Sequence, residues 1–312
     1  MEFLKMLQTI RNPVLDVLLG LVTRLGEETI LMVLGMAILW CVNKKWGYRL
    51  MFISLAGTAV NQLLKAIFLI PRPWVLDPTF EIVESAREAA TGYSFPSGHT
   101  QTAATVFGTM ALWTKKRWGS ALCVLTILLV GFSRMYLGVH TPLDVGVSLI
   151  TGALTVGLLA PLMARHEGSD RGRLWLSAGF ILSALVLLGY VYLAPERAAN
   201  VAEFDAHGEK AAWTLLGTMI GMALTWYLDA KYIHFETKAV WWAQAIKVAA
   251  GLVLVLAVRM GAKPLFTALW GDAMFTHGIR YFLMVMMGGV IWPMTFGWFS
   301  RLGKVKKEEA AV

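Results

Sequence analysis

The chain has 312 residues, of which 57% are hydrophobic and 15% are charged, and its net charge is +8. Soluble globular chains carry about 25% charged residues, so this composition excludes an ordinary soluble domain and indicates several membrane spans. The positive charge does not indicate nucleic-acid binding, because most basic residues lie in short loops between apolar segments, as topology signals do. Cys41 and Cys123 both lie in apolar segments and predict no disulfide framework.

The first 25 residues alternate apolar and polar side chains and contain Pro13. We expect residues 3–25 to form a helix, which Pro13 can break, lying in the membrane interface; a further span is the alternative. The apolar segments that follow suit spanning helices. They cover approximately residues 29–43, 47–70, 97–114, 119–137, 142–164, 174–193, 211–228, 240–259 and 279–300. The sequence therefore predicts an all-α, polytopic transmembrane helical bundle of about nine spanning helices.

Two longer polar connections interrupt the apolar segments. Residues 71–95 are expected to form a short lid helix beside the polar clusters described below, and residues 194–210 a solvated loop. Lys247 lies in the middle of segment 240–259, with Gln244 on the same helical face. A contact inside the bundle is the favoured interpretation of Lys247, and binding of a lipid headgroup is the alternative.

Basic residues are concentrated in alternate connections. They are Lys44, Lys45, Arg49, Lys115, Lys116, Arg117, Arg165, Arg171, Arg173, Lys231, Lys238, Arg301, Lys304, Lys306 and Lys307. The positive-inside tendency places these connections in the cytoplasm. We therefore expect an integral protein of a bacterial inner (plasma) membrane, with the three polar clusters on the extracytoplasmic side.

One polar cluster opens segment 142–164 with the sequence Gly138-Val139-His140-Thr141-Pro142-Leu143-Asp144. His140 and Asp144 are four residues apart, so the carboxylate can reach the imidazole if the intervening turn is helical. A carboxylate on one ring nitrogen fixes the tautomer and leaves the other nitrogen free as a nucleophile. A His–Asp pair that only ties down a helix end is the alternative.

A second cluster, Pro96-Ser97-Gly98-His99, begins segment 97–114. Ser97 is a plausible N-cap, and the free N–H groups and dipole of a helix start favour a phosphate. His99 in the first turn could protonate a leaving oxygen as a general acid. An ordinary capped helix with an interfacial histidine is the alternative.

Three cations complete the set. Lys65 lies inside an apolar run, where an unpaired charge is costly, so it is expected to reach an anion; snorkelling to the headgroups is the alternative. Arg72 stands between Pro71 and Pro73, and Arg134 follows a long apolar run. Guanidinium groups bind phosphate bidentately, so two arginines and a lysine could neutralise a phosphate.

Together the clusters resemble the type-2 phosphatidic acid phosphatase superfamily: Lys, six residues, Arg-Pro; Pro-Ser-Gly-His; then Ser-Arg, five residues, His, three residues, Asp. The resemblance covers residues from about 25 to 165, without a departure from the pattern. It implies that His140 becomes a phosphohistidine, Asp144 orients it and His99 serves the leaving group. It also implies a phosphate cradle made of Lys65, Arg72, Ser97, Gly98 and Arg134.

The resemblance further implies a membrane phosphatase that needs no metal and no cofactor. It would hydrolyse a phosphomonoester or diphosphate of a polyprenyl, glycerolipid or sphingoid amphiphile on the extracytoplasmic side. A lipid phosphotransferase and a catalytically silent lipid-binding or transport scaffold stay open as alternatives. Vanadium haloperoxidases share the cradle but are soluble, so the spans argue against that activity. The expected partners are the phosphorylated lipid and membrane lipids, not nucleic acid, and a homo-oligomer stays open.

We divide the chain into an interfacial segment (1–25), a phosphatase core bundle (26–165) and additional transmembrane helices (166–312). No motif assigns a role to the last part. His207 and His277 fall outside every cluster and are interpreted as non-catalytic.

Overall fold

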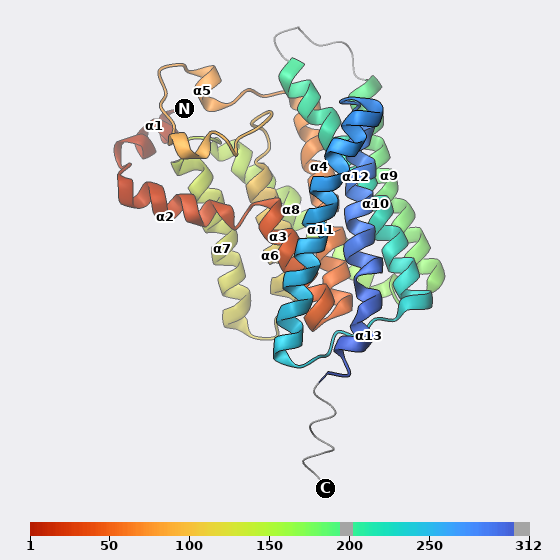
Figure 1. Cartoon of the computed structure of the whole chain (residues 1–312). Helices are drawn as coiled ribbons and strands as arrows, with labels where there is room; N and C mark the ends of the chain where they lie inside the picture. Colours follow the sequence, from red (N-terminus) through yellow and green to blue (C-terminus); the bar gives the residue numbers. More distant parts are fainter. Residues whose placement is uncertain (194–201, 303–312) are drawn as a thin grey trace. The chain divides into compact units, whose positions relative to one another are not determined.

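A computed structural model of the chain describes residues 1–193 and 202–302. The described residues contain helices and turns but no β-strand, which confirms the expected all-α fold (Figure 1). In chain order the elements are α1 (Glu2–Thr9), α2 (Pro13–Arg24), α3 (Glu28–Ala37), the π-helix η1 (Ile38–Val42), α4 (Lys44–Phe68), α5 (Pro73–Leu76), the 3-10 turn η2 (Glu84–Ala86), α6 (Gly98–Trp113), α7 (Arg117–Tyr136), α8 (Pro142–His166), α9 (Asp170–Leu193), α10 (Ala202–Leu228), the π-helix η4 (Asp229–Ile233), α11 (Trp241–Trp270), α12 (Phe275–Met286), the π-helix η5 (Met287–Ile291), the 3-10 turn η6 (Pro293–Thr295) and α13 (Phe296–Phe299).

Among the described residues, seven helices are long and apolar enough to cross a membrane, or eight if α2 and α3, bent by 48°, form one broken span. The expected segment 97–114 is α6, which has 16 residues and is shorter than the ~20 residues of a typical span. Each expected apolar segment therefore coincides with a helix, and the structure supports a polytopic bundle.

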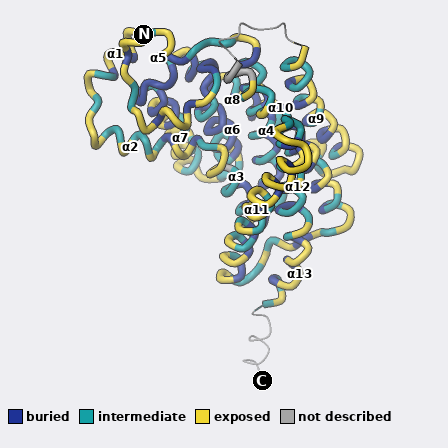
Figure 2. The backbone as a smooth tube through the Cα atoms, turned by 45° about the horizontal axis from the view of Figure 1, so that its top comes forward, coloured by how far each residue is buried: buried dark blue, intermediate teal, exposed yellow. Residues whose placement is uncertain are grey.

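The N-terminal segment is broken at the expected place. Asn12 accepts a hydrogen bond from the Leu15 N–H, and Pro13 is the first residue of α2, where its missing N–H costs nothing. Both α1 and α2 pack against α7, and α1 does so with Leu4 and Leu7 buried. Much of α2 is exposed in Figure 2, including its apolar residues Val14, Val17, Leu18 and Leu21. An interfacial location for this apolar face stays a prediction.

The two polar connections agree with expectation to different degrees. Residues 71–95 contain two short helical elements, α5, which starts at Pro73, and η2; a lid role for this connection stays a prediction. The loop expected at 194–210 is wrong from Ala202 onward, where α10 already begins, in a stretch rich in good helix formers. Residues 194–201 lie outside the described part of the chain.

The chain forms two compact units, described here one at a time. Of the described residues, the first contains those within Met1–Met32, Ile53–Leu162 and Leu185–Ala212, and the second contains those within Val33–Phe52, Met163–Ala184 and 213–302. In the first unit α6 packs against α7, and in the second α11 packs against α12. Five helices, α3, α4, α8, α9 and α10, contribute residues to both units.

The second unit has a buried polar centre at Lys247, which is 0% exposed. Its ammonium donates to the carbonyl oxygens of Trp40 (2.9 Å), Thr237 (3.2 Å) and Glu236 (3.3 Å) and lies 4.1 Å from the centre of the Phe296 ring. This arrangement confirms a contact inside the bundle and leaves no ammonium surface for a headgroup.

Ion pairs gather several basic connections at one end of the second unit. Lys44 pairs with Asp229 at 2.7 Å, and Arg49 pairs with Glu167 at 2.5 Å. The connections near residues 44–49, 167 and 229 therefore lie close together, as expected for loops on one side of a membrane.

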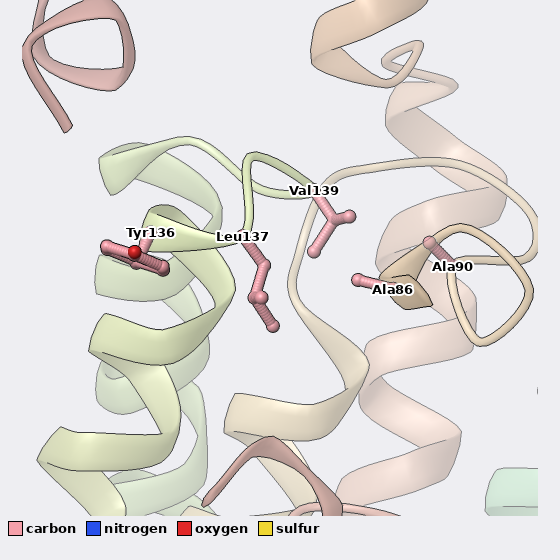
Figure 3. Packing of buried hydrophobic residues seen from close by; sticks show 5 residues of the cluster. All are labelled: Ala86, Ala90, Tyr136, Leu137 and Val139. Atoms are coloured by element: carbon pink, nitrogen blue, oxygen red, sulfur yellow. The ribbon is translucent and has the colours of Figure 1, made fainter. Parts of the chain in front are cut away.

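A small hydrophobic cluster in the first unit fixes the connection 71–95 onto the turn that precedes α8. Its buried members are Ala86, Ala90, Tyr136, Leu137 and Val139 (Figure 3). The Val83 N–H also donates to the Leu137 carbonyl at 3.1 Å. Because His140 follows Val139 directly, this packing determines where the histidine backbone lies.

Candidate active site

The three polar clusters meet in the first unit, at the end of α4, the start of α6, the end of α7 and the start of α8. Six of the eight predicted site residues are buried: Lys65, Arg72, Ser97, Arg134, His140 and Asp144. Two contacts join clusters that are far apart in sequence. Arg72 Nη1 lies 2.9 Å from His140 Nε2, and the Ser97 N–H donates to the Asp144 carbonyl at 3.2 Å.

A tight turn delivers His140 to this site. The helix α7 ends at Tyr136, and Gly138 then adopts φ +80°, a left-handed conformation that glycine accepts readily at a helix C-terminus. Pro142 begins α8 two residues after His140. The histidine is thus held between two helix ends, and only 1% of it is exposed.

Asp144 points one carboxylate oxygen toward the histidine. His140 Nδ1 lies 3.4 Å from Asp144 Oδ2, which is longer than an ordinary hydrogen bond. The same oxygen accepts two short bonds, from Ser94 Oγ (2.6 Å) and from the Thr141 N–H (2.7 Å). Ser94 Oγ is also 3.5 Å from His140 Nδ1. The carboxylate is therefore fixed by two other donors while it faces the imidazole.

The two ring nitrogens of His140 have different roles. A guanidinium can only donate, so the contact with Arg72 makes Nε2 the unprotonated nitrogen and places the ring proton on Nδ1, facing Ser94 and Asp144. Burial, and then the charges of Arg72 and Arg134, hold the pKa of His140 well below its ordinary value of 6.5. The imidazole is neutral near pH 7, as a nucleophile must be.

Backbone carbonyls orient Arg72 and Lys65. Arg72 donates from Nε to the Gly92 carbonyl (3.0 Å) and from Nη2 to the Thr91 carbonyl (2.6 Å). The Lys65 ammonium donates to the Tyr93 carbonyl. Since Lys65 is 7% exposed and bound in this way, its charge does not snorkel to the membrane surface. Three consecutive carbonyls, at residues 91–93, thus hold two of the predicted cations.

The start of α6 has the predicted capped form. The Ser97 side chain accepts hydrogen bonds from the hydroxyl (2.9 Å) and N–H (3.5 Å) of Thr100, which leaves the Ser97 proton able to donate. A Cβ atom on Gly98 would find its nearest neighbour at 3.8 Å, the Asn61 Oδ1 atom. An anion can therefore approach this backbone closely.

Arg134 and His99 carry buried donors that no described residue satisfies. Arg134 Nη1 donates to Thr23 Oγ1 at 2.9 Å, but Arg134 Nε, Arg134 Nη2 and His99 Nε2 have no hydrogen-bond partner in the described part of the chain. Buried polar groups are nearly always paired in folded proteins. Arg134 and His99 also act electrostatically on His140, so both lie near it. An oxyanion bound beside His140 could accept hydrogen bonds from their free donors. No group of three or more His, Cys, Asp or Glu side chains among the described residues is placed to hold a metal ion.

Sequence reasoning missed two residues that orient this site. Ser94 is fully buried and donates a hydrogen bond to Asp144. The only sequence signal for this role was its position two residues before the cluster that begins at Pro96. Thr23, on α2, holds one side of Arg134. A single threonine in an apolar helix gives no sequence signal for that contact.

Comparison with known proteins places these residues in a family. The sequence model described as "PAP2 superfamily" matches residues 46–167, and one described as "PAP2 superfamily phosphatase, transmembrane extension" matches residues 213–305. Phosphatidylglycerophosphatase B of Bacillus subtilis is 30% identical over 163 residues, covering 48% of this chain and 73% of that protein.

Two further relatives are similar over other lengths. Undecaprenyl-diphosphatase BcrC of Bacillus subtilis is 35% identical over 106 residues, 34% of this chain, and the match spans only 51% of BcrC. A probable sphingosine-1-phosphate phosphatase of Dictyostelium discoideum is 27% identical over 241 residues, 72% of this chain and 57% of that protein. No solved structure matches the chain.

Proposed function

Because the chain belongs to the PAP2 superfamily, we propose that it is a metal-independent membrane lipid phosphatase that forms a phosphohistidine at His140. The observation that carries the proposal is the set of buried donors on Arg134 and His99 that have no partner among the residues the structure describes. They lie in a site whose histidine is neutral and has an oriented tautomer. This combination suits a phosphate that is bound by cations and attacked by an imidazole nitrogen.

The first step transfers the phosphoryl group to the protein. The phosphate displaces Arg72 Nη1 from His140 Nε2 and accepts hydrogen bonds from that Nη1 group, from Lys65 and from Arg134. His140 Nε2 then forms a bond to phosphorus while the bond to the lipid oxygen breaks, and His99 gives a proton to the departing oxygen. Asp144 and Ser94 hold Nδ1, so that the positive charge formed on the ring is stabilised.

The second step releases phosphate. His99, now unprotonated, accepts a proton from a water molecule that attacks the phosphohistidine. The nitrogen–phosphorus bond breaks, orthophosphate leaves, and both histidines return to their starting protonation states. The cations supply the positive field that a divalent ion provides in other phosphatases, so the proposed chemistry uses no metal.

The substrate is proposed to be a phosphorylated amphiphile on the extracytoplasmic side. The names of the relatives specify undecaprenyl diphosphate, phosphatidylglycerophosphate and sphingosine 1-phosphate as substrates of those proteins. All three classes carry a phosphate at the end of a membrane-embedded lipid, which agrees with a cradle formed where helices end.

The test is phosphate release by detergent-purified protein from a panel of lipid mono- and diphosphates in EDTA. We expect orthophosphate as the product, with the rate unchanged by the chelator. Loss of activity in EDTA and its recovery with magnesium would contradict the metal-independent mechanism. Transfer of phosphate to an added alcohol without orthophosphate release would identify a phosphotransferase instead. Inactivity on every lipid would favour the catalytically silent lipid-binding or transport scaffold.

Orthovanadate tests the cradle directly. It can adopt the trigonal-bipyramidal shape expected at phosphorus, so we expect competitive inhibition. Arg134→Ala should weaken vanadate inhibition and turnover together, because the same guanidinium holds the substrate phosphate and the transition state. Unchanged vanadate inhibition in that variant would show that Arg134 does not bind the phosphate.

A further inference from the structure

The helix α10 brings His207 against the loop that holds the cradle cations. A Cβ atom on Gly92 would lie 3.0 Å from His207 Cδ2 and 3.5 Å from His207 Nε2, so the half-buried imidazole packs directly on the Gly92 backbone. His207 lies between the two matched regions, residues 46–167 and 213–305. Its contact with the site is therefore not a feature that either family match covers.

Gly92 is the middle residue of the carbonyl triplet 91–93. It adopts φ +64°, a conformation that costs glycine little, and its carbonyl accepts the Arg72 Nε–H at 3.0 Å. The carbonyls on either side hold Arg72 Nη2 and the Lys65 ammonium. A displacement of Gly92 would therefore move both cations.

We propose that His207 is a positioning residue for the phosphate cradle, acting through the triplet 91–93. This inference rests on the proposed function, in which phosphate replaces the contact between Arg72 and His140. During that exchange Nε and Nη2 of Arg72 stay on the Gly92 and Thr91 carbonyls, so the triplet determines where the guanidinium can lie. Misplacement of a catalytic contact by about 1 Å can cost ~100-fold in rate.

The charges near His207 add a second link to the site. Lys65, Arg72 and Lys210 all act electrostatically on its ring. The described residues offer the ring no hydrogen bond, and the ring packs on Gly92. The observations therefore favour an effect through packing on the loop over a direct bond to substrate.

The experiment compares His207→Ala with His207→Phe, which keeps an aromatic ring but cannot titrate or donate. His166→Ala is the matched control, because that histidine is exposed at the far end of α8. We expect His207→Ala to raise the inhibition constant of orthovanadate and to lower kcat/KM about tenfold or more. His207→Phe should recover most of both, on monophosphate and diphosphate substrates alike.

Two results would overturn the proposal. One is an unchanged vanadate inhibition constant in His207→Ala. The other is a loss confined to diphosphate substrates that phenylalanine does not rescue, which would mean that the imidazole contacts the second phosphate directly. Vanadate affinity is also measured without lipid, from the thermal stabilisation of the full-length protein. If the protein binds vanadate but hydrolyses no lipid, the proposed function is contradicted. The effect of His207→Ala on vanadate affinity can still be measured in that case, so the two proposals fail separately.

A double-mutant cycle isolates the contact from general damage. Gly92→Ala introduces both backbone strain and a collision with His207, but the strain is the same whether residue 207 is histidine or alanine. We therefore expect the loss in vanadate affinity caused by Gly92→Ala to be smaller in the His207→Ala background. Two losses that simply multiply would show that the residues act independently and would overturn the proposal.

Discussion

At the residue scale, His140 uses each ring nitrogen for a different purpose. Its Nε2 faces the cations, and its Nδ1 faces Asp144 and Ser94. The longer distance to Asp144 is accompanied by short bonds from Ser94 and Thr141 to the same carboxylate oxygen. Orientation of the imidazole therefore depends on a small network and not on a single His–Asp bond.

Substitution of the nucleophile tests this network. His140→Ala should lose ~10³-fold or more in turnover while the protein still folds, since removal of a nucleophile abolishes the covalent route. Asp144→Asn should also cause a severe but smaller loss, because the ring remains present and is only misoriented. Turnover and trapping of labelled phosphoprotein are the measurements. Wild-type activity or labelling in His140→Ala would eliminate the phosphohistidine at this position.

The lowered pKa of His140 predicts a pH dependence of stability. In the unfolded chain this imidazole gains a proton near pH 6.5, whereas in the folded protein it does so only well below 6.5. Below pH 6.5 the unfolded state therefore binds more protons, so the free energy of unfolding should fall as the pH falls through this window. Thermal unfolding between pH 5 and pH 7, in roughly half-unit steps around the ordinary histidine pKa, measures the slope.

His140→Gln supplies the control for that slope, since glutamine cannot titrate. We expect the variant to lose stability less steeply than the wild type as the pH is lowered. Substrate-free protein is used because a phosphate group itself titrates near pH 6. Identical slopes in the two proteins would mean that His140 has an ordinary pKa.

At the scale of elements, the α2–α3 connection is pressed against the site. A Cβ atom on Gly26 would lie 2.7 Å from the His99 carbonyl oxygen and 2.8 Å from a Val130 methyl group. Glycine is therefore required for this close approach. The same connection follows Thr23, which holds Arg134, so its position affects two site residues.

Gly26→Ala should destabilise the protein by about 1–3 kcal/mol, the usual cost of overpacking, and lower turnover as well. Gly20→Ala, on the preceding helix α2, is the matched control, because no atom lies within 4 Å of the added methyl group. It should be neutral or gain up to ~1 kcal/mol from helix propensity. Thermal unfolding in detergent compares the two variants; equal effects would show that α2 and α3 can separate from α6.

At the scale of the whole molecule, the distribution of basic connections predicts the side of the membrane on which the site opens. The prediction places residues 80–90 outside and residues 166–170 in the cytoplasm, because the latter neighbour the basic connections. Glu88 and Ser169 are both exposed in the structure and suit single cysteine substitutions after replacement of Cys41 and Cys123 by serine.

A membrane-impermeant maleimide added to intact cells should label Glu88→Cys and not Ser169→Cys. Permeabilised cells serve as the control, since both cysteines should then react. The reverse pattern in intact cells would overturn the topology and move the proposed hydrolysis to the cytoplasmic face.

Local patterns explain how much could be predicted from the sequence. Apolar run length and helix periodicity depend on neighbouring residues, so every expected apolar segment coincides with a helix. The spacing of Lys65, Arg72, Ser97, His99, Arg134, His140 and Asp144 likewise suffices to select the residues that the fold brings together. Pro71, Pro73 and Pro78 are the local signals that agree with the short length of the helical elements in the connection 71–95.

Contacts between distant residues were decided only by the tertiary structure. Ser94 and Asp144 are 50 residues apart, and Thr23 and Arg134 are 111 apart; no periodicity connects such pairs. The contact of His207 with Gly92 is also one that no periodicity connects. The carbonyls that hold Arg72 and Lys65 could not be predicted either, because every residue type has the same backbone carbonyl. Side-chain chemistry is encoded locally, whereas the orientation of those side chains depends on packing between helices that are remote in the chain.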